Sequence, residues 1–117
     1  MPKQILLVIS LSVILITTIV VYKLNAPAYQ YKPGSWAEAD LAINQAYHFY
    51  QLKQQGEDLS SGPCLSNDLI PDWVADLVHD PRTEVDDLPE NQCRAYLEGR
   101  ASHFVELDIE GKLVRVQ

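Results

Sequence analysis

Hydrophobic and polar positions divide the chain into two unlike parts. From Ile5 to Tyr22 the sequence is apolar and uncharged, interrupted only by serine and threonine, whose hydroxyls can bond back to their own helix. At about 1.5 Å per residue this run predicts a helix roughly 27 Å long, close to the ~30 Å hydrocarbon core of a bilayer. We therefore expect a single transmembrane anchor over residues 5–24, which contacts the lipid bilayer, and a cytoplasmic tail over residues 1–4.

Residues around the apolar run favour an anchor that stays attached. Lys3 and Lys23 flank the run and can extend their charged ends toward water, and Tyr22 and Tyr31 are placed for an aromatic belt. The alternative is a cleaved signal peptide, because Ala26-Pro27-Ala28 fits the A-x-A pattern of a cleavage site. The run is longer than a usual signal-peptide core, and Lys23 separates it from that site. We therefore favour an uncleaved signal-anchor over secretion after cleavage near Ala28.

A stretch with two prolines and a glycine over residues 25–34 predicts a short, stiff spacer, and the pattern beyond it predicts a small domain over residues 35–117. Ser35-Trp36-Ala37-Glu38 matches the S-x-x-E capping box, which predicts the start of a helix that ends near Gln55. Apolar residues recur along this segment at helical spacing, so the helix is expected to be amphipathic. Gly56 then predicts a left-handed residue that stops the helix.

Two shorter elements are expected in the middle of the domain. Pro71, followed by the apolar residues of the segment 73–78, predicts a short second helix that ends at Asp80-Pro81. Residues 83–91 form an acidic loop, and residues 92–97 are long enough for one helical turn.

The clearest β pattern lies between residues 102 and 116. Residues 102–107 alternate, with His103, Val105 and Leu107 on one face, and residues 113–116 predict the returning strand. The sequence Asp108-Ile109-Glu110-Gly111 predicts a hairpin turn between them, with glycine where positive φ is needed. Since two strands alone are marginally stable, the hairpin is expected to pack on the helices. The predicted fold class is α+β: a transmembrane helix, a long amphipathic helix, a short helix and a β-hairpin.

The two cysteines, Cys64 and Cys93, predict one disulfide. A bond between them closes a loop of about 30 residues, for which the loop-entropy relation gives roughly 3.6 kcal/mol. The alternative is a pair of free or metal-bound thiols, with His79 or His103 as a base. Positive charges before and after the anchor balance, so the positive-inside rule does not choose an orientation. Because disulfides persist outside the cytoplasm, we expect the N-terminus inside and the domain outside.

The domain carries many more acidic than basic residues. Beyond residue 34 there are sixteen acidic and six basic residues, a net charge of −10. Phosphate backbones would repel such a domain, so we expect no nucleic-acid partner. The sequence contains no P-loop, H-E-x-x-H or G-x-G-x-x-G motif and no Ser-His-Asp order, so no catalytic residue and no cofactor are predicted.

Acidic residues in the middle of the domain carry the remaining site predictions. On the predicted second helix, Asp72, Asp76 and His79 would share one face, which makes them weak candidates for a metal site. The acidic loop could hold calcium, but it lacks the spacing of an EF-hand. A solvated face of an amphipathic helix looks the same as such a metal site, so we favour solvation over metal binding, and we likewise favour a loop without calcium. The candidate interaction surface combines this helix with the acidic loop: Asp76, Asp80, Glu84, Asp86 and Asp87.

Three stretches carry a resemblance to known proteins: G-P-C-L-S-N-D-L-I-P-D-W-V, D-L-P-E-N-Q-C and H-F-V-E-L-D-I-E-G-K-L-V-R-V. They resemble uncharacterised short membrane-anchored proteins of candidate-phyla bacteria, over about half the chain, which implies a location and no activity. The arrangement of elements is more loosely similar to type IV pilins and pseudopilins. The prepilin peptidase signature is absent before Ile5, and Pro27 and Pro33-Gly34 interrupt the helix, so no functional residue is carried over.

These patterns predict a membrane-tethered structural or protein-interaction domain of the cell envelope, without catalytic activity and with an envelope protein as its partner. The first alternative is a pilin-like or secretion-system accessory subunit, which predicts that the long helix packs across a sheet of three or more strands. The second is a small envelope hydrolase or redox protein that uses a histidine or the cysteines.

Overall fold

The computed structural model describes residues 2–25 and 30–117. The predicted cleavage site, Ala26-Pro27-Ala28, lies outside the described residues. The elements, in chain order, are α1 (Lys3–Leu24), α2 (Ala37–Gln54), β1 (Cys64–Ile70), β2 (Trp73–Val78), η1 (Glu84–Asp87), η2 (Pro89–Asn91), α3 (Arg94–Leu97), β3 (His103–Asp108) and β4 (Leu113–Val116), where η marks a 3-10 helix.

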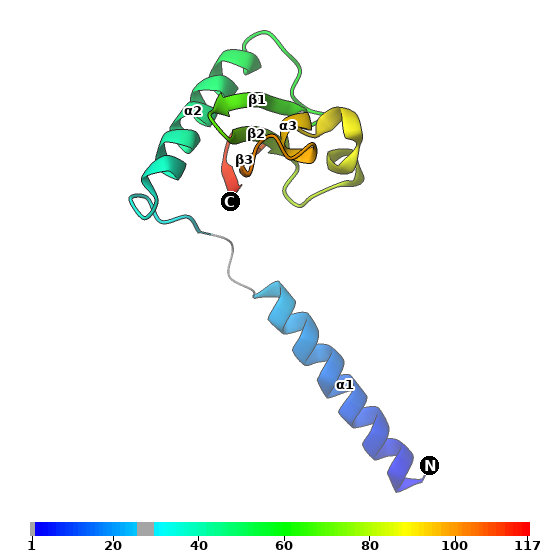
Figure 1. The fold of residues 1–117 in the computed structure, drawn as a ribbon. Coiled ribbons are helices and arrows are strands. Elements are labelled where there is room, and N and C mark those ends of the chain that lie inside the picture. The colour runs from blue at the N-terminus through cyan, green and yellow to red at the C-terminus, as the bar shows by residue number, and fades with distance from the viewer. Residues whose placement is uncertain (1, 26–29) are drawn as a thin grey trace.

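Helix α1 is long and apolar enough to cross a membrane or to serve as a signal sequence. It has 22 residues, its most apolar stretch of 18 residues has a mean hydropathy of 2.8, and none of its residues is buried. The hydroxyls of Ser12, Thr17 and Thr18 donate to carbonyls one turn earlier, at 2.8 to 2.9 Å, so these polar groups are satisfied within the helix. Figure 1 shows α1 lying apart from the other elements.

Helix α2 confirms the predicted long helix and its end near Gln55, but neither of the predicted capping devices forms. Trp36 is the N-cap residue, and no side chain caps the helix. Ser35 donates instead to the carbonyl of Lys32 at 2.6 Å, and Glu38 accepts from the indole of Trp73 at 2.8 Å, so the capping box does not form. Gly56 is not among the residues with positive φ, so it is not a left-handed stop.

The strands form one four-stranded sheet in the order β1-β2-β3-β4. Strands β1 and β2 are antiparallel, β2 and β3 are parallel, and β3 and β4 are antiparallel. The predicted second helix is therefore wrong, because residues 73–78 are a strand in the middle of the sheet. Pro71 and Asp72 form the turn that enters it, and Asp72 has a φ of 73°. A strand covered on both faces is apolar almost throughout, and periodicity cannot separate it from a short buried helix.

The predicted hairpin between β3 and β4 is confirmed. Gly111 has a φ of 90°, as its turn requires, and a Cβ atom there would lie 2.5 Å from the ring of Tyr50. The Tyr50 hydroxyl donates to the carbonyl of Ile109 at 2.9 Å. The turn therefore packs on α2, as expected for a hairpin that needs support from a helix. The helical turn expected within residues 92–97 is also confirmed, as α3.

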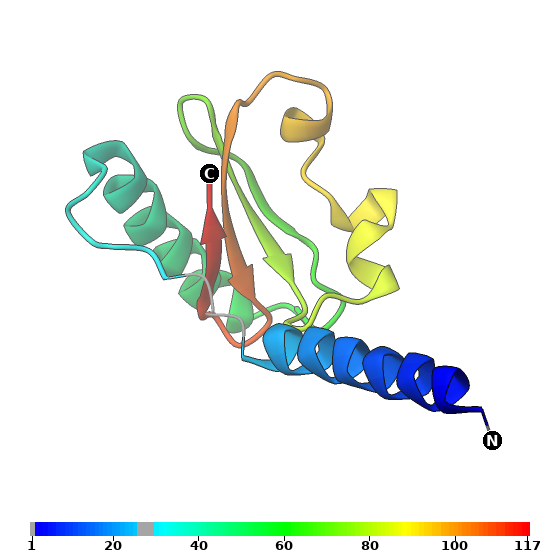
Figure 2. The ribbon, with the colours of Figure 1, turned by 90° about the horizontal axis from the view of Figure 1, so that it is seen from below.

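The domain has three layers, with the sheet in the middle (Figure 2). Helix α2 covers one face, where its alanines and Ile43 pack against inward-facing residues of the sheet. The connection from β2 to β3, which contains η1, η2 and α3, covers part of the other face. A smaller apolar cluster lies there, made of Val74, Cys93, Ala95, Ala101 and Phe104. The Cys64–Cys93 disulfide joins β1 to the start of α3 and holds this layer on the sheet.

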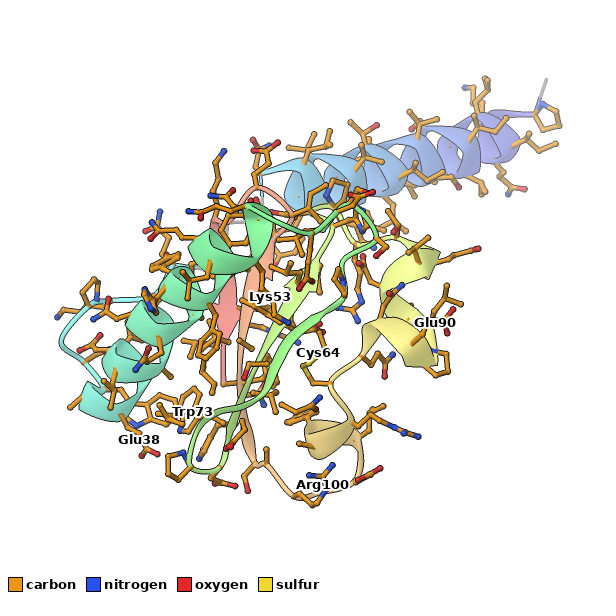
Figure 3. The ribbon with its side chains drawn as sticks, turned by 90° about the horizontal axis from the view of Figure 1, so that it is seen from above. Glu38, Lys53, Cys64, Trp73, Glu90 and Arg100 are labelled. Carbon is orange, nitrogen blue, oxygen red and sulfur yellow. A yellow bond between two sulfur atoms is a disulfide. The ribbon has the colours of Figure 1, made fainter. Side chains whose placement is uncertain are left out.

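An aromatic cluster fixes the first turn of α2 to the edge of the core. The ring of Trp73 stacks on His103 with centroids 4.7 Å apart, and Trp36 lies against both rings at 5.1 and 5.3 Å. Trp73 is almost fully buried, and Glu38 accepts its indole N–H. Figure 3 shows Glu38 and Trp73 together at one end of α2, with Lys53 at the other end.

Candidate functional site

A pocket of about 350 Å³ opens on the sheet face away from α2. Its floor is formed by side chains of β2, β3 and β4, and α3 supplies one wall. This face is the one that the connection between β2 and β3 covers only in part (Figure 2). The lining combines apolar and charged groups, which is the usual composition of a binding pocket.

Two carboxyl groups lie in the floor of this pocket, on neighbouring strands. Asp76 of β2 and Glu106 of β3 are register partners in the parallel pair, so their side chains leave the sheet on the same face. Glu106 is buried and Asp76 is partly buried. Asp76 Oδ1 is the one buried side-chain polar atom in the described chain that has no hydrogen-bond partner. An unpaired buried oxygen is costly, so its retention needs an explanation.

The environment of Asp76 opposes ionisation of its carboxyl group. Desolvation, and then the neighbouring charge of Glu106, raise the pKa of Asp76 to about 8. A backbone hydrogen bond from Leu77 and then the charge of Arg82 lower the pKa of Asp76, but by less. At neutral pH the Asp76 carboxyl is therefore mainly protonated, and it ionises when a cation comes close enough to stabilise the carboxylate.

Two arginines reach the same region, and both are already paired with other carboxylates. Arg115 of β4 donates to Glu106 at 2.9 Å, and its guanidinium lies 4.9 Å from the centre of the Phe104 ring. Arg82 donates to Asp87 at 3.1 and 3.2 Å, and its nearest nitrogen lies 3.9 Å from Glu106. Glu106 therefore has cationic partners on two sides, whereas no ion pair is found for Asp76 in residues 2–25 and 30–117.

Exposed apolar side chains gather on the segment that covers the pocket face. Tyr96 and Leu97 of α3 line the pocket and are 40% and 58% exposed. Val85 and Leu88, earlier in the same connection, are also exposed. Groups of exposed apolar side chains are a common feature of binding surfaces. Helix α2 also exposes two leucines on the other side of the sheet, Leu41 and Leu52.

The acidic loop is organised around Asp86, whose side chain is fully buried. Its carboxylate accepts the backbone N–H groups of His79 and Thr83 at 2.9 to 3.1 Å. His79 Nδ1 lies 2.8 Å from the same carboxylate, and Nε2 lies 2.8 Å from the carbonyl of Ser60. Since both partners are acceptors, this geometry fits the imidazolium form of His79. Asp86 is thus a structural group, and its prediction as part of an exposed interaction surface is wrong.

The charges of this pair follow from their contacts. Burial disfavours ionisation of Asp86, but the hydrogen bonds from Thr83 and His79 outweigh it and hold the pKa of Asp86 below its usual range. The hydrogen bond with Asp86 raises the pKa of His79. Asp86 and His79 therefore form a charged pair that fixes the start of the connection between β2 and β3.

The other predicted site residues are spread over the domain. Asp72 lies in the turn between β1 and β2, where its carboxylate accepts the backbone N–H of Ser102 at 2.9 Å. Asp80 and Glu84 are exposed, and Asp87 pairs with Arg82 near the pocket. Because residues 73–78 are a strand, Asp72, Asp76 and His79 do not share a helix face. No group of three or more acidic, histidine or cysteine residues suited to a metal is found in the described part of the chain.

Both cysteines are in the predicted disulfide, and no free thiol remains. The interpretation of Cys64 and Cys93 as free or metal-bound thiols is therefore wrong. His103, considered as a base, stacks on Trp73 on the α2 side of the sheet, as expected from its place beside Val105 and Leu107.

Sequence reasoning missed Glu106 and both arginines as site residues. A useful indication was present in the sequence, because Asp76 and Glu106 each interrupt an otherwise apolar strand, in W-V-A-D-L-V and F-V-E-L. An acidic residue in the centre of a buried strand is rare unless it is paired. That indication becomes informative only when both segments are recognised as strands.

No family model, curated protein or solved structure matches this chain. The resemblances to short membrane-anchored bacterial proteins and to pilins therefore stay predictions. The geometry of the domain is the basis for any functional statement.

Proposed function

We propose that this chain is a membrane-tethered interaction domain of the cell envelope, anchored by α1 and binding a partner protein at the pocket face of its sheet. The observation that carries the proposal is the pocket itself, with its unpaired Asp76 carboxyl and the exposed apolar side chains of α3 beside it. Together they form a surface that combines apolar area with specific polar groups, as protein-binding sites do.

The proposed location is the cell membrane, with the N-terminus inside and the domain outside. Its support is twofold. The length and hydropathy of α1 suit a single span. The Cys64–Cys93 disulfide suits an oxidising compartment. Release of the domain after cleavage near Ala28 is the alternative for the same helix.

Two exposed leucines allow a controlled test of the proposed surface. Leu97 on α3 and Leu52 on α2 are exposed to a similar extent, 58% and 54%, and lie on opposite sides of the sheet. A photoreactive amino acid is placed at one position or the other in the full chain, in cells. The proposal predicts a discrete adduct with an envelope protein from position 97 and none from position 52. Equal adducts from both positions, or no adduct from position 97, would contradict it.

A pilin-like or secretion-system subunit is the second candidate, favoured by one observation. Helix α2 packs across a sheet of four strands, which meets the condition set for this hypothesis. The same photoreactive variants distinguish the candidates. A subunit that assembles with copies of itself gives a ladder of adducts at multiples of the chain mass, whereas an interaction domain gives one adduct with a different protein.

A further inference from the structure

We propose that the pocket receives a positively charged side chain, an arginine or a lysine, from a basic segment of the partner protein. This inference rests on the proposed function and adds to it the chemistry of the bound group. The geometry that carries it is a buried Asp76 oxygen without a hydrogen-bond partner, in a pocket whose two arginines are both paired with other carboxylates.

The charged groups around the pocket are incompletely paired. The lining itself holds two carboxyl groups, Asp76 and Glu106, and two guanidinium groups, Arg82 and Arg115. A third carboxylate, Asp87, pairs with Arg82 from outside the lining. Arg115 is paired with Glu106 and Arg82 with Asp87, so one further cation beside Asp76 would complete the set. Bidentate or charge-assisted hydrogen bonds from that cation would satisfy a carboxyl that the protein itself leaves without an ion pair.

The walls of the pocket suit the apolar stem of a long basic side chain. Val74 and Phe104 form part of the floor and Tyr96 and Leu97 part of the wall. The ring of Tyr96 meets that of Phe104 edge-on, with centroids 5.1 Å apart. Lysine and arginine side chains bury their methylene groups on such surfaces, and their charged ends are attracted to aromatic faces.

The charge of the whole domain favours the same class of partner. A net charge of −10 beyond residue 34 attracts basic segments and repels acidic ones before contact is made. An anionic ligand would have to overcome this field, although two arginines lie at the pocket. The domain charge and the unpaired carboxyl therefore point to a cation.

Binding of a cation should be coupled to release of a proton. The groups that face Asp76 are Glu106 on β3, Arg115 on β4, Arg82 after β2 and Asp86 on η1. These surroundings keep the Asp76 carboxyl mainly protonated below about pH 8. A cation binds the carboxylate better than the acid, so affinity should rise by about tenfold per pH unit well below that value and level off above it.

The test uses the full chain in a non-ionic detergent, with N-acetyl-arginine methylamide as the probe. The citrulline analogue has nearly the same shape without the charge and serves as the matched ligand. Binding to every protein is followed by NMR through the methyl groups of Val74 and Leu97, which line the pocket, between about pH 6 and pH 9. In the wild type the carboxyl carbon of Asp76 reports its ionisation as well. Two variants with the same change of net charge are compared, Asp76→Asn in the pocket and Asp68→Asn at an exposed position of β1.

The expected result is saturable binding of the arginine probe, with an affinity at least about tenfold above that of the citrulline probe and rising with pH as described. Asp76→Asn removes the pH dependence and weakens binding, whereas Asp68→Asn behaves like the wild type. Equal binding of both probes, a pH-independent affinity, equal effects of both variants, or no binding would overturn the inference. Preferential binding of acetate at the arginines would also overturn it.

Failure of this inference can be told apart from failure of the proposed function. If position 97 still gives its adduct with an envelope protein while the arginine probe does not bind, the surface is an interaction site for another chemistry. If the adduct is absent and the arginine probe binds Asp76, the pocket takes small cations and the protein-binding proposal fails.

Discussion

Asp76 and Glu106 are register partners on the two central parallel strands, and both side chains lie on the sheet face that α2 does not cover. This relationship places two carboxyl groups at the floor of one pocket. Glu106 is compensated by Arg115 at 2.9 Å, whereas Asp76 retains a buried oxygen without a partner. The pair is therefore asymmetric, with one carboxylate paired and one carboxyl kept mainly protonated at neutral pH.

Replacing Asp76 with asparagine should change how stability depends on pH. The pKa of Asp76 is about 8 in the folded chain and near its ordinary value of 3.8 in the unfolded chain. Between these values the folded state binds the extra proton, so rising pH lowers the free energy of unfolding, by up to about 1.4 kcal/mol per pH unit. Above about pH 8 this contribution no longer changes.

Denaturant unfolding of wild type and Asp76→Asn at several pH values measures this effect. Tryptophan fluorescence is a suitable readout, because Trp36 and Trp73, the two tryptophans of the sequence, both lie in the aromatic cluster of the domain. The variant should be the more stable protein at pH 8, and the difference should shrink as the pH is lowered toward 4. Parallel stability curves for the two proteins would show that Asp76 is not protonated in the folded state.

Removing the acceptor for the Trp73 indole should destabilise the junction between α2 and the sheet. Trp73 is 1% exposed and donates to Glu38 at 2.8 Å, so Glu38→Ala leaves a buried N–H group without its partner. The expected loss is about 1 kcal/mol in the free energy of unfolding. Glu38→Gln keeps an acceptor oxygen and serves as the control, with a smaller loss. Equal losses in both variants would mean that charge, and not this hydrogen bond, matters at position 38.

Removing the disulfide should destabilise the domain and loosen the layer over the pocket. Cys64 and Cys93 are 29 positions apart, and a loop of that size corresponds to about 3.6 kcal/mol. The double variant Cys64→Ser, Cys93→Ser should lose about this amount in the free energy of unfolding. Wild-type protein kept in a thiol reductant is the matched control and should show the same loss. Unchanged stability in both samples would contradict a structural role for the bond.

The parts of the fold that could be predicted from the sequence depend on local patterns. The hairpin is specified by alternation in β3 and β4 and by Gly111, whose φ of 90° the turn requires. The amphipathic helix α2 is visible from its spacing of apolar residues. The disulfide could be predicted because the sequence contains two cysteines in a small domain.

The middle of the domain could not be predicted in this way, because its pattern is ambiguous. Residues 73–78 are covered by α2 on one face and by α3 on the other, so almost every position is apolar and no alternation remains. Pro71 precedes the segment as it would precede a helix, but here it lies in the turn between β1 and β2. Strand β1 was not predicted either. Its register with β2 is interrupted by bulges, which weakens the alternation of apolar and polar residues along the strand.

The pocket could not be predicted because it depends on pairing between distant segments. Asp76 was singled out, but as part of a helix face with Asp72 and His79. Its actual neighbour, Glu106, lies 30 positions further along the sequence, and only the parallel register of β2 and β3 brings the two together. The burial of Asp86 was also missed. Thr83-Glu84-Val85-Asp86 is a capping-box pattern that the sequence shows, but the contact of Asp86 with His79 depends on the fold.

The most direct test of the account is the sidedness of the full chain in its membrane. A C-terminally tagged protein is fractionated. Cells whose outermost envelope layer has been permeabilised are then treated with proteinase K, a protease of broad specificity that can cut the exposed spacer residues 32–35. The account predicts a full-length protein in the membrane fraction whose tagged fragment is released without opening the membrane itself. Protection of the tag until the membrane is opened, or a soluble tagged protein that begins after Ala28, would contradict a domain tethered outside by α1.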